Sequence, residues 1–150
     1  MTRVLSPVAG VRQDVSATPD PVFATGLVGP GAAILPAPGR QEAHSPVDGV
    51  LTKLYPHAFV VVTDRGPGVL VHLGMDTVHL AGDGFEVLAT EGDRVAAGDP
   101  IVRWDPSHVE RAGHSPVCAV VVLDCPFPAR SLGEPGSTVA TGSLLFEVDC

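Results

Sequence analysis

Six histidines carry most of the side chains in this sequence that could do chemistry near neutral pH, and two of them are placed so that they can meet. His57 precedes one short apolar segment, and His72 lies near the end of the next. The residues between these segments, Asp64–Gly68, have the composition of a turn, so we expect an antiparallel hairpin. A turn centred between its first two residues places His57 opposite His72, and a turn centred on Gly66 makes them diagonal neighbours. The imidazoles can converge in either register, about 5 Å or about 7–8 Å apart.

Two imidazoles at contact distance have three chemical uses. They can share a bound anion, they can hold a metal ion between them, or one ring can carry a phosphoryl group while the other donates a hydrogen bond to it. Neutral imidazole is a good nucleophile near pH 7, and its nitrogen is also a good leaving group. Gly74, two residues after His72, would let the backbone approach a bulky group. The alternative is two ordinary surface histidines on a hairpin.

The elements that must position these histidines are short strands. The chain has 17 glycines and 15 prolines among 150 residues, which would interrupt almost every candidate helix. Short β-branched or apolar segments lie between these breakers and predict strands. The expected strands are 51–55, 58–63, 69–73, 85–89, 100–105, 117–124 and 144–149. Seven or more short strands predict an all-β fold, a β-sandwich or a partly open barrel.

One short helix and one long loop complete this prediction. Asp105 is expected to cap a helix that begins at Pro106 and stops at Gly113. The segment Ala17–Pro38, rich in proline and glycine, is expected to wrap the sheets as an ordered loop.

Two kinds of segment recur along the chain. The first kind begins Ser-Pro-Val at residues 6, 45 and 115, and the second is a valine, two small residues, a glycine and an apolar strand, at 95–102 and 139–146. The spacing is too irregular for a solenoid or propeller. These repeats predict one domain, residues 1–150, built from two related halves.

The net charge of −8 argues against nucleic acid and anionic membrane surfaces as partners. No apolar run approaches the length of a membrane span, and the first 11 residues lack the pattern of a secretory signal. The three cysteines form no C-x-x-C motif, so a disulfide framework is not expected. Cys125 and Cys150 are expected to be free thiols, and the expected location is the cytoplasm.

Seven segments of the chain match one known family in the same order. The most specific is Val71-His72-Leu73-Gly74-Met75-Asp76-Thr77-Val78. The others, which are weak singly and strong in this order, are 6–10, 19–24, 45–49, 57–59, 82–85 and 91–95. Through these segments the sequence resembles, over nearly its whole length, the glucose-type enzyme IIA domain of the bacterial phosphoenolpyruvate:sugar phosphotransferase system.

The resemblance implies a phosphocarrier without a cofactor, with a duplicated antiparallel β-sandwich, or barrel-sandwich hybrid, containing one or two short helical turns. The phosphoryl group would come from a phosphohistidine of the carrier protein HPr and leave to a cysteine of an enzyme IIB domain. The partners would thus be HPr and an enzyme IIB/IIC sugar permease, with regulatory proteins as further candidates. The protein would meet the membrane only through the permease, and a free-standing domain is expected.

The resemblance also implies roles for individual residues. His72 matches the phosphorylated histidine, and His57 matches the partner histidine that orients the phosphoryl group. The expected partner-binding residues are two acidic residues and three apolar ones, Asp20, Asp76, Val22, Phe23 and Phe59. An apolar surrounding would exclude the water that hydrolyses phosphohistidine.

The sequence departs from the family pattern beside both histidines. Where the family usually has a threonine two residues before its first histidine, this chain has Tyr55, and Pro56 directly precedes His57. His79 occupies a position that is often acidic or polar in the family. It would add positive charge near the docking surface.

Two other classes of protein share this architecture. A zinc-dependent hydrolase could use His72 and Asp76, whose spacing suits metal ligands, but such enzymes also need an H-x-H pair that this chain lacks. A biotin or lipoate carrier needs a lysine at a hairpin tip, and the only lysine, Lys53, lies inside an expected strand. A metal held by His57 and His72 themselves stays open. The phosphocarrier is the leading prediction.

Overall fold

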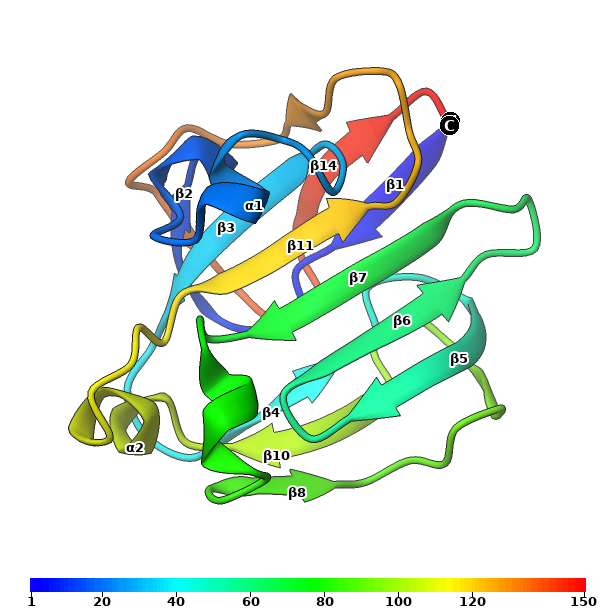
Figure 1. Ribbon diagram of the computed structural model, residues 1–150. Coiled ribbons are helices and arrows are strands. Elements are labelled where there is room, and N and C mark those ends of the chain that lie inside the picture. Colours follow the sequence, from blue (N-terminus) through cyan, green and yellow to red (C-terminus); the bar gives the residue numbers. More distant parts are fainter.

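The structure, a computed structural model, describes all 150 residues, and its strands pair antiparallel throughout (Figure 1). Eight strands form one large sheet. In spatial order they are β13 (Thr138–Val139), β2 (Gly10–Gln13), β3 (Gly31–Pro36), β11 (Cys118–Val122), β7 (Gly68–Leu73), β6 (Ala58–Val62), β5 (Gly49–Tyr55) and β9 (Arg94–Val95).

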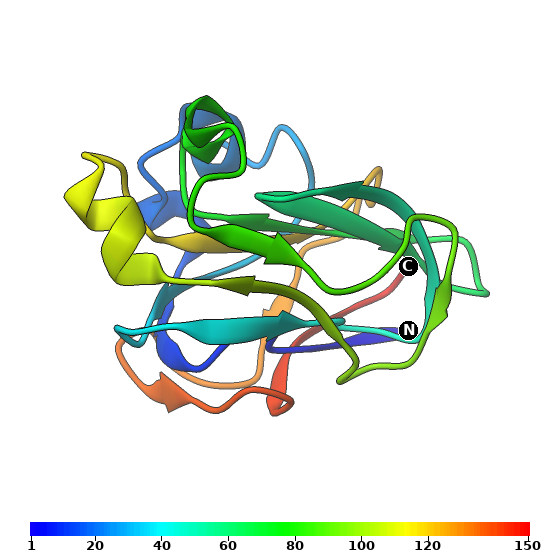
Figure 2. The same cartoon turned by 90° about the horizontal axis from the view of Figure 1, so that it is seen from below.

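Two smaller sheets cover one face of the large one, as the view from below shows (Figure 2). One contains β1 (Thr2–Leu5), β14 (Leu144–Val148) and β12 (Arg130–Ser131), and the other β4 (Gln41–His44), β10 (Pro100–Trp104) and β8 (Phe85–Val87). The helical segments are the 3-10 turns η1 (Val15–Ala17) and η2 (Thr77–Leu80) and the short helices α1 (Pro21–Ala24) and α2 (Pro106–Arg111). The prediction of an all-β sandwich with short helical turns is confirmed.

The main core lies between the large sheet and the two small ones. It contains 24 buried residues, most of them on strands from β1 to β14. Phe59 and Val71 enter it from the large sheet, and Ile101, Trp104 and Phe146 from the small sheets. Alternation along β7, where Val69, Val71 and Leu73 are buried, leaves His72 on the opposite face. The core therefore fixes which side of the sheet carries the histidine.

The internal duplication is visible in the hydrogen bonds. Ser6 Oγ donates to the carbonyl of Val8, and Ser45 Oγ donates in the same way to Val47. Each serine carbonyl also accepts the amide of the glycine in a second-type segment, Gly142 for Ser6 and Gly98 for Ser45. The Ser-Pro-Val copy at residue 115 departs from this pattern, because its serine hydroxyl accepts from the amide of Val117.

The seven expected strands are all present with small changes at their ends, and α2 begins as expected, with the Asp105 side chain accepting from the amide of Ser107. The expected loop 17–38 is wrong in part, because it contains β3, a strand inside the large sheet. Small residues make β3 resemble a loop in sequence. Glycine is required at position 31, since a Cβ there would clash with the carbonyl oxygen of Val120.

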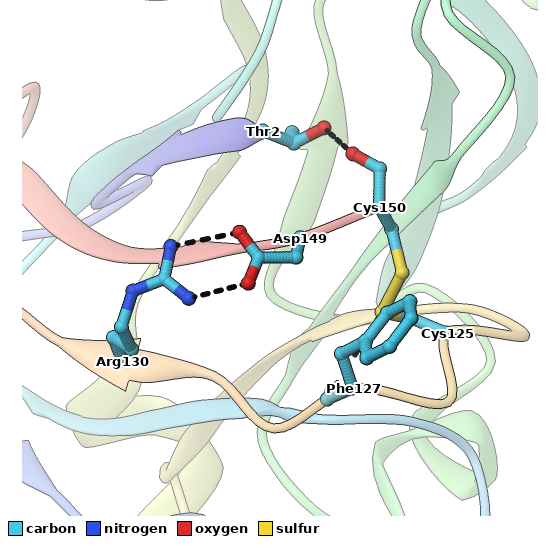
Figure 3. Close-up of a disulfide and its surroundings, with 6 residues drawn as sticks. All are labelled: Thr2, Cys125, Phe127, Arg130, Asp149 and Cys150. Atoms are coloured by element: carbon cyan, nitrogen blue, oxygen red, sulfur yellow. Dashed lines mark hydrogen bonds and ion pairs between the residues drawn. A yellow bond between two sulfur atoms is a disulfide. The ribbon is translucent and has the colours of Figure 1, made fainter.

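The C-terminal end is fastened by a disulfide (Figure 3). Cys125 and Cys150 are bonded, with their Cα atoms 6.1 Å apart, so the prediction that both are free thiols is wrong. Thr2 Oγ1 donates to the Cys150 carbonyl, and Arg130 binds both carboxylate oxygens of Asp149 at 2.9 and 3.1 Å. Residues far apart in sequence thus meet beside β14, a proximity that spacing along the chain does not reveal.

Candidate functional site

His57 lies in the tight turn between β5 and β6. Tyr55 pairs with Ala58, so Pro56 and His57 alone form the turn. The carbonyl oxygen of His57 accepts a hydrogen bond from the amide of Leu73 at 2.7 Å, and this bond connects the turn to the end of β7. The adjacent β6–β7 hairpin places Ala58, not His57, opposite His72. Neither register considered from the sequence is therefore the observed one.

The two histidine rings nevertheless converge. Their centroids lie 5.3 Å apart, with an interplanar angle of 71°. A residue one position away from a strand pair would normally point to the other face of the sheet. His57 belongs to the turn rather than to β6, so the alternation of side chains between the two faces of the strand does not apply to it. Its ring can therefore lie on the same face as that of His72.

A backbone carbonyl fixes the proton on the His72 ring. Nδ1 of His72 lies 2.6 Å from the carbonyl oxygen of Gly74. A carbonyl can only accept a hydrogen bond, so Nδ1 carries the hydrogen, and in the neutral ring Nε2 bears the free lone pair. Gly74 has a φ of +78°, and a Cβ there would lie 2.6 Å from Thr77 Cγ2. The chain therefore needs glycine where the carbonyl must face the histidine.

Burial keeps both histidines neutral to lower pH. It is the main cause that lowers the pKa of His72 below its ordinary value, against the opposing effects of the Gly74 carbonyl and the carboxylates of Asp20 and Asp76. Burial also lowers the pKa of His57, and the neighbouring His72 adds to that effect. Near neutral pH the Nε2 lone pair of His72 is available for attack.

Phe23 forms the apolar wall of the site. Its ring centroid lies 5.3 Å from that of His72, and it is only 6% exposed. It packs with Met75, Ala119 and Val121 in a small cluster on the outer face of the large sheet. The expected apolar surrounding of His72 is thus present, but Phe23 itself offers a partner almost no surface.

The other expected partner-binding residues divide into two groups. Val22 and Asp76 are exposed and Asp20 is half-buried, and both carboxylates are close enough to His72 to raise its pKa. Asp20 also accepts the amide of Val22 as the cap of α1. Phe59 has no exposed surface and belongs to the main core. The prediction that Phe59 contacts a partner does not fit this burial, and its inward position on β6 is the reason.

Three features near the site were not predicted from the sequence. The ring of Tyr55 lies 5.9 Å from that of His57, and the ring of His79 stacks on that of His114 at 6.4 Å. The Gly74 carbonyl acts on His72, whereas the sequence indicated only a need for space. The contact between Tyr55 and His57 had one signal in the sequence, the tyrosine at position 55 where the family usually has threonine.

Comparison with known proteins identifies the family. A family model described as the phosphoenolpyruvate-dependent sugar phosphotransferase system, EIIA 1, matches residues 2–126. The chain belongs to this family. It is 37% identical over 123 residues to the PTS system glucose-specific EIIA component of Staphylococcus aureus (strain MRSA252), covering 81% of this chain and 73% of the relative. It is 40% identical over 121 residues to the PTS system beta-glucoside-specific EIIBCA component of Bacillus subtilis (strain 168), covering 79% of this chain and 20% of that protein.

A solved structure agrees. The glucose permease IIA of Mycoplasma capricolum superimposes with a TM-score of 0.84 at 30% identity, covering 97% of this chain and 94% of that one. The protein is therefore an EIIA component, a phosphocarrier in the relay of sugar uptake, and acts as a transferase.

The comparisons give the zinc hydrolase no support. The structure has no group of three or more His, Cys, Asp or Glu side chains that could hold a metal ion. None of its helices is long and apolar enough to cross a membrane.

Proposed function

We propose that His72 is the residue that carries the phosphoryl group, on Nε2. The observation that carries this proposal is the hydrogen bond from Nδ1 of His72 to the Gly74 carbonyl, which leaves Nε2 as the nucleophilic atom. In the first step Nε2 attacks the phosphorus of a phosphohistidine on HPr. The N–P bond of the donor breaks, its imidazole leaves, and a new N–P bond forms on His72.

In the second step a cysteine thiolate of an enzyme IIB domain attacks the same phosphorus. The S–P bond forms as the bond to Nε2 breaks, and His72 leaves as an imidazole. His57, whose ring lies 5.3 Å from that of His72, donates a hydrogen bond to the phosphoryl oxygens and stabilises the charge that develops during transfer. Its lowered pKa makes it neutral near pH 7, so the donor is an imidazole N–H rather than a permanent cation.

The docking surface is the outer rim of the site. Val22 on α1 and Val78 on η2 are exposed apolar side chains beside the two acidic residues, and Asp20 and Asp76 form no ion pair within the chain. A basic patch on HPr would complement these two carboxylates, while the apolar residues exclude water from the reacting groups. Phe23 supports this surface from below, because it packs against His72.

We further propose that residues 1–150 act as one enzyme IIA domain, in the cytoplasm, between HPr and the enzyme IIB/IIC permease, with regulatory proteins as further partners. The single main core, which joins strands from both halves, supports the one-domain assignment.

The test is incubation with phosphoenolpyruvate, enzyme I and HPr, followed by intact-mass measurement and mapping of the modified residue. We expect an acid-labile gain of one phosphoryl group, lost in His72→Gln and retained in the control His44→Gln, which alters a histidine on β4. A phosphoryl group acquired by His72→Gln at the normal rate would overturn the assignment. His57→Ala, which removes the N–H that donates to the phosphoryl oxygens, should pass the group poorly to enzyme IIB.

A further inference from the structure

Four aromatic rings form a row across the site. Centroid distances are 5.9 Å from Tyr55 to His57, 5.3 Å from His57 to His72 and 5.3 Å from His72 to Phe23. The row begins at the last residue of β5 and ends on α1. His72 has a hydrogen bond and a buried phenylalanine to hold it, so the inner end of the row is fixed by the fold.

The His57 ring has no such support. No hydrogen bond within the chain fixes either of its nitrogens, and only its backbone carbonyl is bonded. Pro56 restrains the backbone of the turn, and its ring lies where a Cβ at Gly82, in the loop after η2, would come within 3.5 Å of it. Neither contact determines the rotation of the imidazole. Two aromatic rings lie next to it, those of Tyr55 and His72.

Tyr55 places a large aromatic ring at an exposed position. It is 52% exposed and does not belong to the core, so folding does not require its ring. Its plane is inclined to that of His57 by 33°, closer to parallel than the 71° between the two histidines. The 5.9 Å between the two centroids lies in the range over which aromatic rings attract each other.

We propose that Tyr55 is a positioning residue for His57, whose ring it holds toward His72 by aromatic packing in place of a hydrogen bond. The expected effect of Tyr55 on the rate of phosphoryl transfer rests on the proposed function, whereas its effect on the orientation of the His57 ring does not. His72 is the ionisable group whose charge lowers the pKa of His57, and the carboxylates of Asp20 and Asp76 act on the pKa of His72.

Removing the Tyr55 ring has two expected consequences. The imidazole gains rotational freedom, so fewer molecules hold it in the orientation that assists transfer. Water also reaches the ring, and because burial is the main cause of the lowered pKa of His57, that pKa should rise toward its ordinary value.

The experiment compares Tyr55→Leu, which keeps an apolar side chain without a ring, with Tyr55→Phe, which keeps the ring without the hydroxyl. The matched control is Phe127→Leu, since Phe127 is a similarly exposed aromatic residue, at 50%. The first measurement is an NMR titration of the His57 and His72 imidazole signals in each purified protein. The second is the kinetics of phosphoryl transfer to an enzyme IIB domain.

For Tyr55→Leu we expect a raised pKa of His57 and a fall in kcat on the order of tenfold to a hundredfold, with KM for enzyme IIB unchanged. Tyr55→Phe and Phe127→Leu should behave as the wild type. An unchanged His57 pKa and kcat in Tyr55→Leu, or a change confined to KM, would overturn the proposal. If the wild type accepted no phosphoryl group, the proposed function would fail, and the titration would still decide the role of Tyr55.

Discussion

The carbonyl oxygen of Gly74 and Nδ1 of His72 lie 2.6 Å apart, so a residue two positions along the chain selects the tautomer of the histidine. Gly74→Ala tests this relationship. A Cβ there would meet Thr77 Cγ2 at 2.6 Å and the Ser115 carbonyl oxygen at 2.9 Å, in a backbone with φ of +78°. We expect a loss of about 1–3 kcal/mol of stability and slower phosphorylation.

The control for backbone strain is Gly66→Ala. Gly66 also has a positive φ, and a Cβ there would meet nothing within 4 Å. Both variants should lose stability in chemical unfolding, but only Gly74→Ala should change the ¹⁵N shifts that report which nitrogen of His72 carries the hydrogen. Unchanged shifts in Gly74→Ala would show that another group selects the tautomer.

The lowered pKa values of His57 and His72 make stability depend on pH. The unfolded histidines take up protons near their ordinary pKa of about 6.5, and the folded ones only below it. The free energy of unfolding is therefore at its full value above about pH 6.5 and falls as the pH drops toward the folded pKa values. Urea unfolding between pH 7.5 and 5 should show this fall, and the double variant His57→Gln/His72→Gln should flatten it. Equal slopes in the two proteins would contradict the burial argument.

The burial of Phe23 reverses an interpretation made from the sequence, in which it was an exposed docking residue. Phe23→Ala should cost about 3 kcal/mol, because it empties a packed position. It should also slow transfer, since the ring supports His72. Val22→Ala, at the neighbouring exposed position, should leave the melting temperature nearly unchanged and raise KM for HPr. A stable Phe23→Ala protein with only a raised KM would restore the original interpretation.

The sequence was sufficient for much of this fold, because its signals were local. Alternation and turn residues located seven strands, and Asp105-Pro106 located the start of α2. The two repeats predicted a duplication that the paired bonds of Ser6 and Ser45 confirm. β3 was missed because its small residues are selected by close contact with β11, a tertiary requirement that leaves no local strand pattern.

The site was predictable in its residue types but not in its geometry. The resemblance identified His57 and His72, yet the contact between them depends on a two-residue turn that places His57 outside β6. The support from Tyr55, the buried position of Phe23 and the disulfide all depend on which segments the fold brings together. No spacing along the chain contains that information.

The two carboxylates at the rim should steer a basic partner. Asp20→Asn keeps the oxygen that caps α1 and removes only its charge. Combined with Asp76→Asn, it should raise KM for phospho-HPr about tenfold at low salt, with kcat nearly unchanged and less dependence on ionic strength. The control, Asp93→Asn/Asp99→Asn, also removes two charges while keeping acceptors for the amides of Thr90 and Ala96. Equal effects of the two double variants would assign the loss to net charge alone.

The Cys125–Cys150 disulfide should stabilise the chain without affecting transfer. It links residues 25 positions apart, and closing a loop of that length removes freedom from the unfolded chain worth about 3 kcal/mol. Cys150 and Gly68, the first residue of β7, both line a surface hollow of about 560 Å³. His72 lies at the opposite end of β7, so the disulfide is remote from the site. Reduction by dithiothreitol should therefore lower the melting temperature and leave the rate of phosphorylation unchanged. Cys125→Ser/Cys150→Ser should match the reduced protein and not respond to the reductant, because the remaining thiol, Cys118, is fully buried. Reduction that slowed phosphorylation would show that the two ends of β7 are coupled.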